Sequence, residues 1–387
     1  MIKLLTAYTQ EVDDPVKAAG EILEQLNLAE KRLAHSAALL FCHSEFIKSG
    51  IMKKVSESLP FETLGCTSQY FALAGASGEI MLTVTVLTSD DTEFAAGLSD
   101  PLTAENTEGR IEALYQKTAA SLDARPELVF TLLPTIFSLT GDDMVAALNR
   151  ACGGIPAFGT GALDIHQDRR NPKTFYQGAA YDNRMALLLL KGPVKPRFFS
   201  FGFPLKSVFT QDAVITGAEG SQITGINNRS AISFVKELGL VEKDGHSVSL
   251  AFPLVIDYGD GTDPQVVVIH DTSPGGALIC SKKVKIGGIL NIGAVTADYV
   301  LESTNTLLQA IKKNGGGAGF FVFSCFLRSV VLGAKPTAEI ELFQKEMSGF
   351  PVPYLLSHSA GEVCPQYTKS GERVNQFSVF ALVACQL

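Results

Sequence analysis

The C-terminal segment Leu355–Val363, LLSHSAGEV, carries the residues of this chain best suited to chemistry. Two leucines typical of a buried strand are followed by Ser357, His358 and Ser359, and after an alanine and a glycine by the carboxylate of Glu362. A hydroxyl, an imidazole and a carboxylate this close together could serve nucleophilic catalysis, or they could hydrogen-bond a small polar ligand. An ordinary exit from a strand into a turn is the third interpretation.

Two catalytic interpretations are open. A serine hydrolase is disfavoured because Ser357 stands where the first glycine of G-x-S-x-G belongs, and the sharp nucleophile turn needs that glycine. A cysteine nucleophile could pair Cys325 with His358, but a thiol at the end of the apolar run FVFSC is expected to be inert if buried. An enzyme that uses Cys325 or His358 is therefore an alternative and not the first hypothesis.

Metal and cofactor sites have less support. The six histidines show no H-x-H or H-x-x-x-H spacing, and the seven cysteines form no CxxC pair, which disfavours the common zinc sites and a disulfide framework. We expect no metal and no cofactor; haem held by His43 or His358, in a gas sensor, is the alternative. The glycine-rich run 314–319 lies between a predicted helix and a strand, the reverse of a phosphate-binding loop.

Ligand binding is the interpretation that the charged residues favour. Glu362 could accept hydrogen bonds from an ammonium or amide group, and Arg328 could hold a carboxylate through two parallel hydrogen bonds. Together they would suit a small zwitterion such as an amino acid. Alternatively, the two side chains pair with each other or are solvated.

The composition excludes several classes of function. The chain has a net charge of -8 and no basic run, which argues against binding nucleic acid or an anionic membrane. No apolar stretch approaches the roughly 20 residues of a spanning helix, and the N-terminus does not resemble a signal peptide. We expect a soluble, cytoplasmic protein.

The elements that position these residues repeat three times along the chain. Each copy has the predicted order β-α-β-α-β-β, and the third is expected to begin with the strand GGILNIGAVT and to end with the strands VPYLLSHSAGEV and NQFSVFALVACQ. Alternating strands and helices predict an α/β fold with mixed sheets. A hairpin-rich insert, roughly 196–285, separates copies two and three; its aspartates at 257, 260 and 263 fit a hairpin better than a calcium loop. We expect two lobes, 1–195 with two repeats and 196–387 with the insert and the third repeat.

Polar residues gather where the second and third predicted strands of each copy end. If these strands are parallel, their ends form one edge, where open α/β sheets bind ligands. Copy two offers little chemistry there, so we expect a site in copy one or three. The residues are Cys42, His43, Ser44, Cys66, Thr67, Ser68, Pro134, Thr135, Thr160, Gly161, Ser324, Cys325, Ser357, His358 and Ser359.

The C-terminal half resembles the FIST family, whose members are predicted small-ligand sensors in signal transduction. The resemblance rests on the S-C-x-x-R element at 324–328, the G-E pair at 361–362 that ends a G-F-Y-x-Y-G-E-I-like strand, and VNQFSVFALV, which is similar to an H-N-Q-T-like strand. The segment from FFSFGFP to VKELG and the N-terminal TAYTQEVDDP and ALLFCHSEF resemble other parts of the family. The chain lacks the aromatic expected near Leu356 and His358, has Phe203 where tryptophan is frequent, and lacks Gly-Glu in copy one, which implies an altered pocket.

The resemblance implies a FIST N-like and a FIST C-like lobe and a sensory protein that is not an enzyme. With the polar residues above, it suggests that an amino-acid-like metabolite binds at one site, where Glu362 takes the cationic end, Arg328 the carboxylate, and His358 tunes the affinity with pH. Because no kinase, cyclase or chemoreceptor module follows, we expect signalling through a separate protein. The expected site residues are Cys325, Arg328, His358, Ser359, Glu362 and Asn375.

Overall fold

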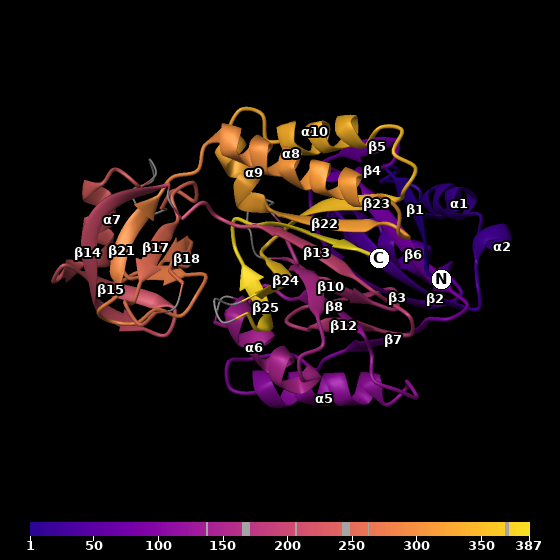
Figure 1. The fold of residues 1–387 in the computed structure, drawn as a ribbon, viewed down its shortest axis with the longest axis horizontal. Helices are drawn as coiled ribbons and strands as arrows, with labels where there is room; N and C mark the ends of the chain where they lie inside the picture. The colour runs from indigo at the N-terminus through magenta and orange to yellow at the C-terminus, as the bar shows by residue number, and fades with distance from the viewer. Residues whose placement is uncertain (137, 165–170, 206, 242–247, 262, 368–370) are drawn as a thin grey trace.

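The computed structural model describes residues 1–387 except 137, 165–170, 206, 242–247, 262 and 368–370. It shows a body of three six-stranded sheets with helices on their outer faces, and a smaller β-domain set apart from it (Figure 1). The expected α/β class, with repeated units and mixed sheets, is confirmed.

Each sheet of the body has four strands from one repeat and a hairpin from another. In repeat one the strands are β1 (Lys3–Thr9), β6 (Leu82–Ser89), β2 (His35–Cys42) and β3 (Glu62–Thr67). In repeat two they are β7 (Glu93–Leu98), β12 (Ala186–Lys191), β8 (Leu128–Leu133) and β9 (Ala157–Gly161). In repeat three they are β13 (Arg197–Phe201), β26 (Leu382–Gln386), β22 (Phe320–Cys325) and β23 (Tyr354–Ser359). The last two strands of each set are parallel to each other, and the other pairs within the set are antiparallel.

The hairpins are exchanged in a closed cycle. Repeat one gives its hairpin to the sheet of repeat three, repeat three gives its own to repeat two, and repeat two gives its own to repeat one. No sheet is therefore completed by one repeat alone. The hairpins are β4–β5 (Phe71–Leu73, Ala76–Gly78), β24–β25 (Glu362–Tyr367, Arg373–Ser378) and β10–β11 (Thr174–Tyr176, Ala179–Tyr181).

One hydrophobic core joins the three repeats. Phe323 of repeat three lies 5.6 Å from Phe41 of repeat one and 5.2 Å from Phe158 of repeat two, measured between ring centroids. Phe130 and Phe321 are 4.8 Å apart in the same core. Because strands buried on both faces read as continuous apolar runs, the sequences LLF, LVF and FFVF are explained by this packing.

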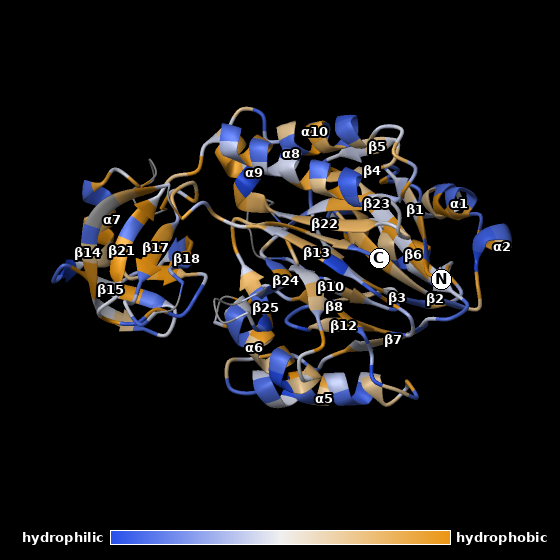
Figure 2. Cartoon of the chain, viewed as in Figure 1, coloured by the Kyte–Doolittle hydropathy of each residue, from blue (hydrophilic) through white to orange (hydrophobic). Residues whose placement is uncertain are grey.

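The helices cover the outer faces of the sheets with one apolar side turned inward, and Figure 2 shows hydrophilic stretches on α1, α2 and α5 beside mainly hydrophobic strands. The first helix is capped by Asp14, whose carboxylate accepts hydrogen bonds from two backbone N–H groups, and Pro15 is the first helical residue. The helices of the body are α1 (Pro15–Leu26), α2 (Leu28–Lys31), α3 (Glu45–Lys48), α4 (Ile51–Glu57), α5 (Thr107–Ala119), α6 (Gly141–Cys152), α8 (Ala297–Asn314), α9 (Phe326–Leu332) and α10 (Ala338–Met347).

The insert forms a separate β-domain, at the left of Figure 1, with its own hydrophobic core. The expected hairpin-rich insert is confirmed: strand Val208–Glu219 pairs antiparallel with Gln222–Ile226, and strand Leu254–Asp257 pairs antiparallel with Gln265–Val267. Its elements are β14 (Val208–Glu219), β15 (Gln222–Ile226), β16 (Arg229–Ser230), α7 (Ala231–Glu237), β17 (Leu254–Asp257), β18 (Gln265–Val267), β19 (Ile269–Thr272), β20 (Leu278–Cys280) and β21 (Ile289–Gly293).

Three details of the expected repeats are wrong. The strand GGILNIGAVT does not open repeat three: it contains β21, which pairs with β14 and β17, and the opening strand is β13. The expected last two strands are each divided, into β23 and β24 and into β25 and β26, because Gly361 adopts a φ of 119° and Phe380 one of 62° between them. Hairpins also follow β3 and β9, where none was expected.

The expected lobe boundary at 195/196 falls between β12 and β13 and stays a prediction about how the chain divides. Among the described residues, no helix is both long enough and apolar enough to cross a membrane.

Candidate functional site

The carboxyl ends of the three parallel strand pairs meet at one place in the body. The backbone N–H of Leu163, after β9, donates to the carbonyl of Thr67 at the end of β3, with N and O 2.9 Å apart. Gly161 donates likewise to Gly361 at 2.8 Å, and His358 to Gln69 at 3.1 Å. Each of these bonds joins two different repeats, so the polar edges that the sequence predicted separately lie side by side.

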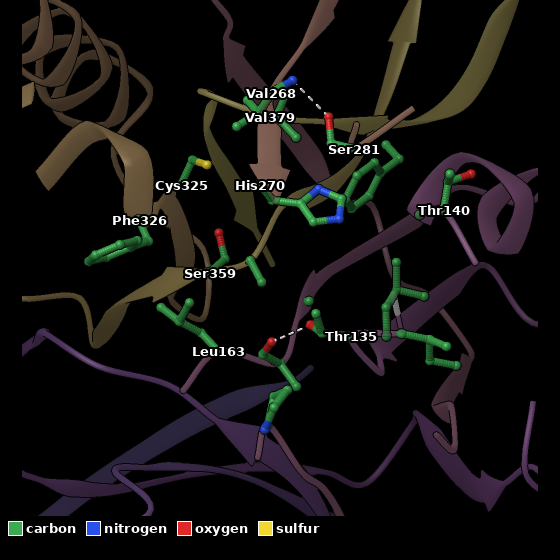
Figure 3. Close-up of a pocket in the computed structure, with 18 of the residues that line it drawn as sticks. Thr135, Thr140, Leu163, Val268, His270, Ser281, Cys325, Phe326, Ser359 and Val379 are labelled. Carbon is green, nitrogen blue, oxygen red and sulfur yellow. Dashed lines mark hydrogen bonds between the residues drawn. The ribbon is translucent and has the colours of Figure 1, made fainter. Parts of the chain in front are cut away.

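A cavity of about 240 Å³ opens beside this junction, between repeat two, repeat three and the inserted domain (Figure 3). Repeat two, from which the sequence suggested little chemistry, supplies one wall. Most of the lining side chains are apolar. The polar ones are Thr135, Thr140 and Asp164 from repeat two, His270, Cys280 and Ser281 from the inserted domain, and Cys325 and Ser359 from repeat three.

Several of the lining polar groups are held in place by the backbone. The hydroxyl of Thr135 donates to the carbonyl of Ala162 at 2.6 Å, and the hydroxyl of Ser281 accepts from the N–H of Val268 at 3.0 Å. His270 reaches from β19 into the space opposite repeat two (Figure 3). Burial lowers the pKa of His270 below its usual value, although nearby Asp271 opposes this, so the imidazole is mainly neutral at neutral pH.

Comparison with protein families divides most of the chain between two domain models. The FIST N domain matches residues 36–229 and the FIST C domain matches residues 231–365. The chain belongs to the FIST family. FIST domains are generally small-ligand sensory domains in signal transduction. A comparison with curated proteins gives no match. Thr135 and Asp164 lie in the part matched by FIST N, and His270, Cys325 and Ser359 in the part matched by FIST C, so the cavity is shared between the two FIST domains.

Glu362 does not line the cavity of this FIST protein, but it contacts Ser359, which does. Its carboxyl oxygen Oε1 is hydrogen-bonded to the hydroxyl of Ser359. Burial raises the pKa of the Glu362 carboxyl well above its usual value, more than the hydrogen bond to Ser359 lowers it. A protonated Glu362 can donate to Ser359, whose own hydroxyl then donates to the carbonyl of Ser324 at 3.1 Å.

Cys325 lines the cavity beside this pair. Burial is also the main reason why the pKa of its thiol is raised well above its usual value, and the neighbouring Glu362 adds to the effect. Because the thiolate is the reactive form, this geometry does not activate Cys325 as a nucleophile. The structure thus brings Cys325, Ser359 and Glu362 together as a group of neutral hydrogen-bonding side chains.

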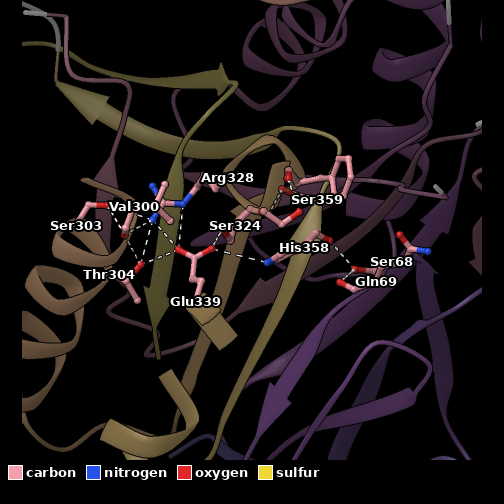
Figure 4. A network of polar contacts seen from close by, with 12 residues as sticks. Ser68, Gln69, Val300, Ser303, Thr304, Ser324, Arg328, Glu339, His358 and Ser359 are labelled. Atoms are coloured by element: carbon pink, nitrogen blue, oxygen red, sulfur yellow. Dashed lines mark hydrogen bonds and ion pairs between the residues drawn. The ribbon is translucent and has the colours of Figure 1, made fainter. Parts of the chain in front are cut away.

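Arg328 lies elsewhere, on α9 among the helices that cover repeat three, with 1% of its surface exposed (Figure 4). Its guanidinium forms an ion pair with Glu339 of α10, with Nη2 and Oε1 2.6 Å apart, and also donates to the carbonyl of Val300 at 3.0 Å. Glu339 accepts further hydrogen bonds from Ser324 and Thr304. The ligand contact expected of Arg328 stays a prediction; in this structure it ties α8, α9 and α10 together.

His358 is fully buried in the same network (Figure 4). Its Nε2 lies 3.7 Å from Oε2 of Glu339, and burial lowers its pKa to about 4 in spite of that carboxylate, so it is neutral at neutral pH. Neither His358 nor His43, the two histidines considered for haem, lines the cavity. Among the described residues, no group of histidine, cysteine and acidic side chains is arranged to hold a metal ion.

Asn375 fastens β25 to repeat two. Its amide donates to the side-chain oxygen of Asn149 at 2.7 Å and to the carbonyl of Ile155 at 2.9 Å, and its oxygen accepts from the N–H of Ala157 at 2.7 Å. These bonds hold the exchanged hairpin in its sheet, and Asn375 does not line the cavity. Its expected role in ligand binding stays a prediction.

Sequence reasoning missed Asp164 and His270 in the cavity and Glu339 in the buried network. Nothing in the local sequence marks His270, which depends on how the inserted domain lies against the body. Glu339 did carry a signal: it stands four and eight residues before Phe343 and Met347, on the buried stripe of α10, where an unpaired carboxylate would be costly.

Proposed function

We propose that this FIST protein senses a small, mainly apolar metabolite that binds in the 240 Å³ cavity. The observation that supports the proposal is the cavity itself, whose walls come from both FIST domains and whose polar groups are few and fixed. Ligand pockets typically measure roughly 300–1,000 Å³, and this cavity of about 240 Å³ lies just below that range, so it suits a small molecule. A ligand in contact with the body and the inserted domain would hold the two in one arrangement, which is a way to produce a signal.

Apolar amino acids are the first ligand class to test. Asp164 is the acidic side chain of the lining and would accept hydrogen bonds from an ammonium group. The hydroxyls of Thr135, Thr140 and Ser281 could meet a carboxylate, and the apolar side chains of the wall would cover the ligand's own. In this proposal Asp164 replaces Glu362 as the partner of the cation, because a protonated Glu362 carries no charge.

A thermal-shift series tests the proposal. L-valine, L-leucine and L-methionine are compared with their N-acetyl derivatives, which lack the ammonium group, and with their methyl esters, which lack the carboxylate. Ligand at a hundred times its dissociation constant stabilises a fold by about 2.7 kcal/mol. With about 2 cal/mol/K of unfolding entropy per residue, that raises the midpoint of this chain by about 3 °C.

Asp164→Asn should abolish the shift, whereas Asp13→Asn, at an exposed position in the loop before α1, should retain it. A shift that survives Asp164→Asn would place the ligand elsewhere. No shift with any of the free amino acids would refute the amino-acid class, and a library of small amines and organic acids would then be the next test.

A further inference from the structure

A second, larger cavity of about 1500 Å³ forms an open groove between the body and the inserted domain. We call it the junction groove. On the body it is lined by β13, α6 and the exchanged hairpin β24–β25, and on the inserted domain by the segment after β17, by β18 and by the basic segment after β20. Nothing in the proposed sensory function uses this groove.

Both walls of the junction groove are basic, although the chain as a whole has a net charge of -8. Three lysines on the inserted domain face two arginines on the body, against three aspartates in the lining. Like charges on opposite walls repel each other, so an anionic guest would neutralise both walls at once. The cations are Lys282, Lys283, Lys285, Arg197 and Arg373, and the aspartates are Asp142, Asp260 and Asp263.

Two of the lysines join the body to the inserted domain. Lys282 lies 3.4 Å from the carboxylate of Asp142, and Lys283 lies 2.5 Å from that of Asp143, both in the first turn of α6. Lys285 and Arg373, in contrast, form no ion pair in the described part of the chain. Lys285 lies over the ring of Tyr258, with its Nζ 5.6 Å from the ring centroid, and the five cations of the lining outnumber its three aspartates by two. The groove therefore carries a net positive charge.

The groove also exposes apolar side chains. Tyr367 is 76% exposed and Leu205 is 41% exposed, and both line the groove, as does Tyr258. Aromatic and arginine side chains at the centre of a docking surface commonly supply most of its binding energy. A guest that matches this surface would carry acidic and apolar side chains together.

The junction groove shares a wall with the ligand cavity. Phe377 and Val379 line both, and the ring of Phe377 fits against Gly141 at the start of α6 and Gly361 after β23, where any added side chain would clash with it. The carbonyl of Phe377 accepts a hydrogen bond from Lys282 of the inserted domain at 3.3 Å. A partner in the groove would thus contact residues that also contact the cavity, which is the reason to expect a signalling partner.

We propose that the junction groove docks an acidic, partly apolar segment of a separate signalling protein. Arg373 and Lys285 are the cations that would bind the carboxylates of this segment. Tyr367 and Leu205 would contact its apolar side chains. Nucleic acid fits less well, because it would bring a phosphate at every nucleotide to a lining that holds three aspartates among its five cations, whereas a peptide can alternate carboxylates with apolar side chains. The proposal does not depend on which metabolite occupies the cavity.

Fluorescence anisotropy with a short labelled peptide of alternating glutamate and leucine tests this proposal on the full chain. The double variant Arg373→Glu/Lys285→Glu should weaken binding by about tenfold or more, because attraction at two positions becomes repulsion. A charge-reversal control, Lys117→Glu at an exposed position on α5 outside the groove, should leave the affinity unchanged. Unchanged thermal midpoints would show that both variants are folded.

Loss of peptide binding in the double variant alone, together with weaker binding at high salt, would support the docking site. Equal binding to the wild type, the double variant and the control would overturn it. Tighter binding of a single-stranded oligothymidine than of the peptide would also overturn it, in favour of nucleic acid. Since the peptide is tested without any amino acid, failure here is distinct from failure of the proposed sensory function.

Discussion

Replacing Arg328 with methionine tests the role of the buried network most directly. Methionine roughly keeps the length of the side chain but removes its charge, which leaves Glu339 buried without its main partner. Removing one partner of a buried ion pair typically costs about 3–5 kcal/mol, because the remaining charge is not compensated. An unfolding entropy of about 2 cal/mol/K per residue makes this a fall of about 4–6 °C in the thermal midpoint of the whole chain.

The pH dependence of this cost identifies its cause. In the wild type, burial raises the pKa of Glu339, but the charge and hydrogen bonds of Arg328, with help from His358 and Ser324, lower it below its ordinary value. Such a group stabilises the fold above pH 4.5, and the effect is lost as the pH falls through the lowered pKa. Without Arg328 the pKa of Glu339 should rise above 4.5, so that the variant regains stability as the pH falls from 8 towards 4.5.

Urea unfolding at pH 8 and near pH 5 measures this difference, and two further variants control it. Arg328→Met/Glu339→Gln leaves no buried charge, so its cost should fall to about 1–2 kcal/mol. Arg110→Met breaks an exposed pair with Asp100 and should cost less than about 1 kcal/mol. If Arg328→Met were as stable as Arg110→Met at pH 8, or if its cost did not change with pH, the reasoning about the buried pair would be wrong.

Three further predictions concern the cavity wall. Glu362→Gln should gain stability relative to the wild type as the pH rises from 5 to 8, because a carboxyl whose folded pKa is raised destabilises the fold once the unfolded chain can ionise. Urea unfolding at the two pH values measures this difference. An equal change of stability with pH in the wild type and the variant would contradict a protonated Glu362. Cys325 should react with iodoacetamide at neutral pH at least about a hundredfold more slowly than free cysteine, because its thiol is buried and the pKa of the thiol is raised. Peptide mass spectrometry measures the rate. Fast labelling would favour the alternative of an enzyme that uses Cys325 as its nucleophile. Gly361→Ala should lower stability by about 2 kcal/mol or more, because the backbone there has a φ of 119° and the added methyl group would clash with the ring of Phe377. Gly349→Ala, where φ is 76° and the space around the glycine is open, should cost less. Equal thermal midpoints for the two variants would contradict the close packing of the Phe377 ring.

The repeated strand and helix order followed from patterns a few residues long. Buried strands read as apolar runs, helices show apolar positions three and four residues apart, and Asp14-Pro15 marks the start of the first helix. These signals are local, so they predicted the α/β class and the gathering of polar residues at strand ends. They also placed Cys325 and Ser359, which the structure brings to the cavity wall.

The sequence could not assign strands to sheets. Strand β21 and strand β13 have similar apolar patterns, and only their hydrogen-bonded neighbours decide that β21 belongs to the inserted domain and β13 to repeat three. The cyclic exchange of hairpins is likewise a choice among distant partners, which a local pattern does not encode.

The chemistry of the predicted site was decided in the same way. Arg328 and Glu362 are 34 positions apart and both looked like ligand contacts. In the tertiary structure Arg328 meets Glu339 across the helices, and Glu362 turns into an apolar wall that favours its neutral form. The sequence by itself determined that ionisable groups would lie near the strand ends. The tertiary structure determined their charge, because burial and the choice of partner exist only after the three repeats pack together.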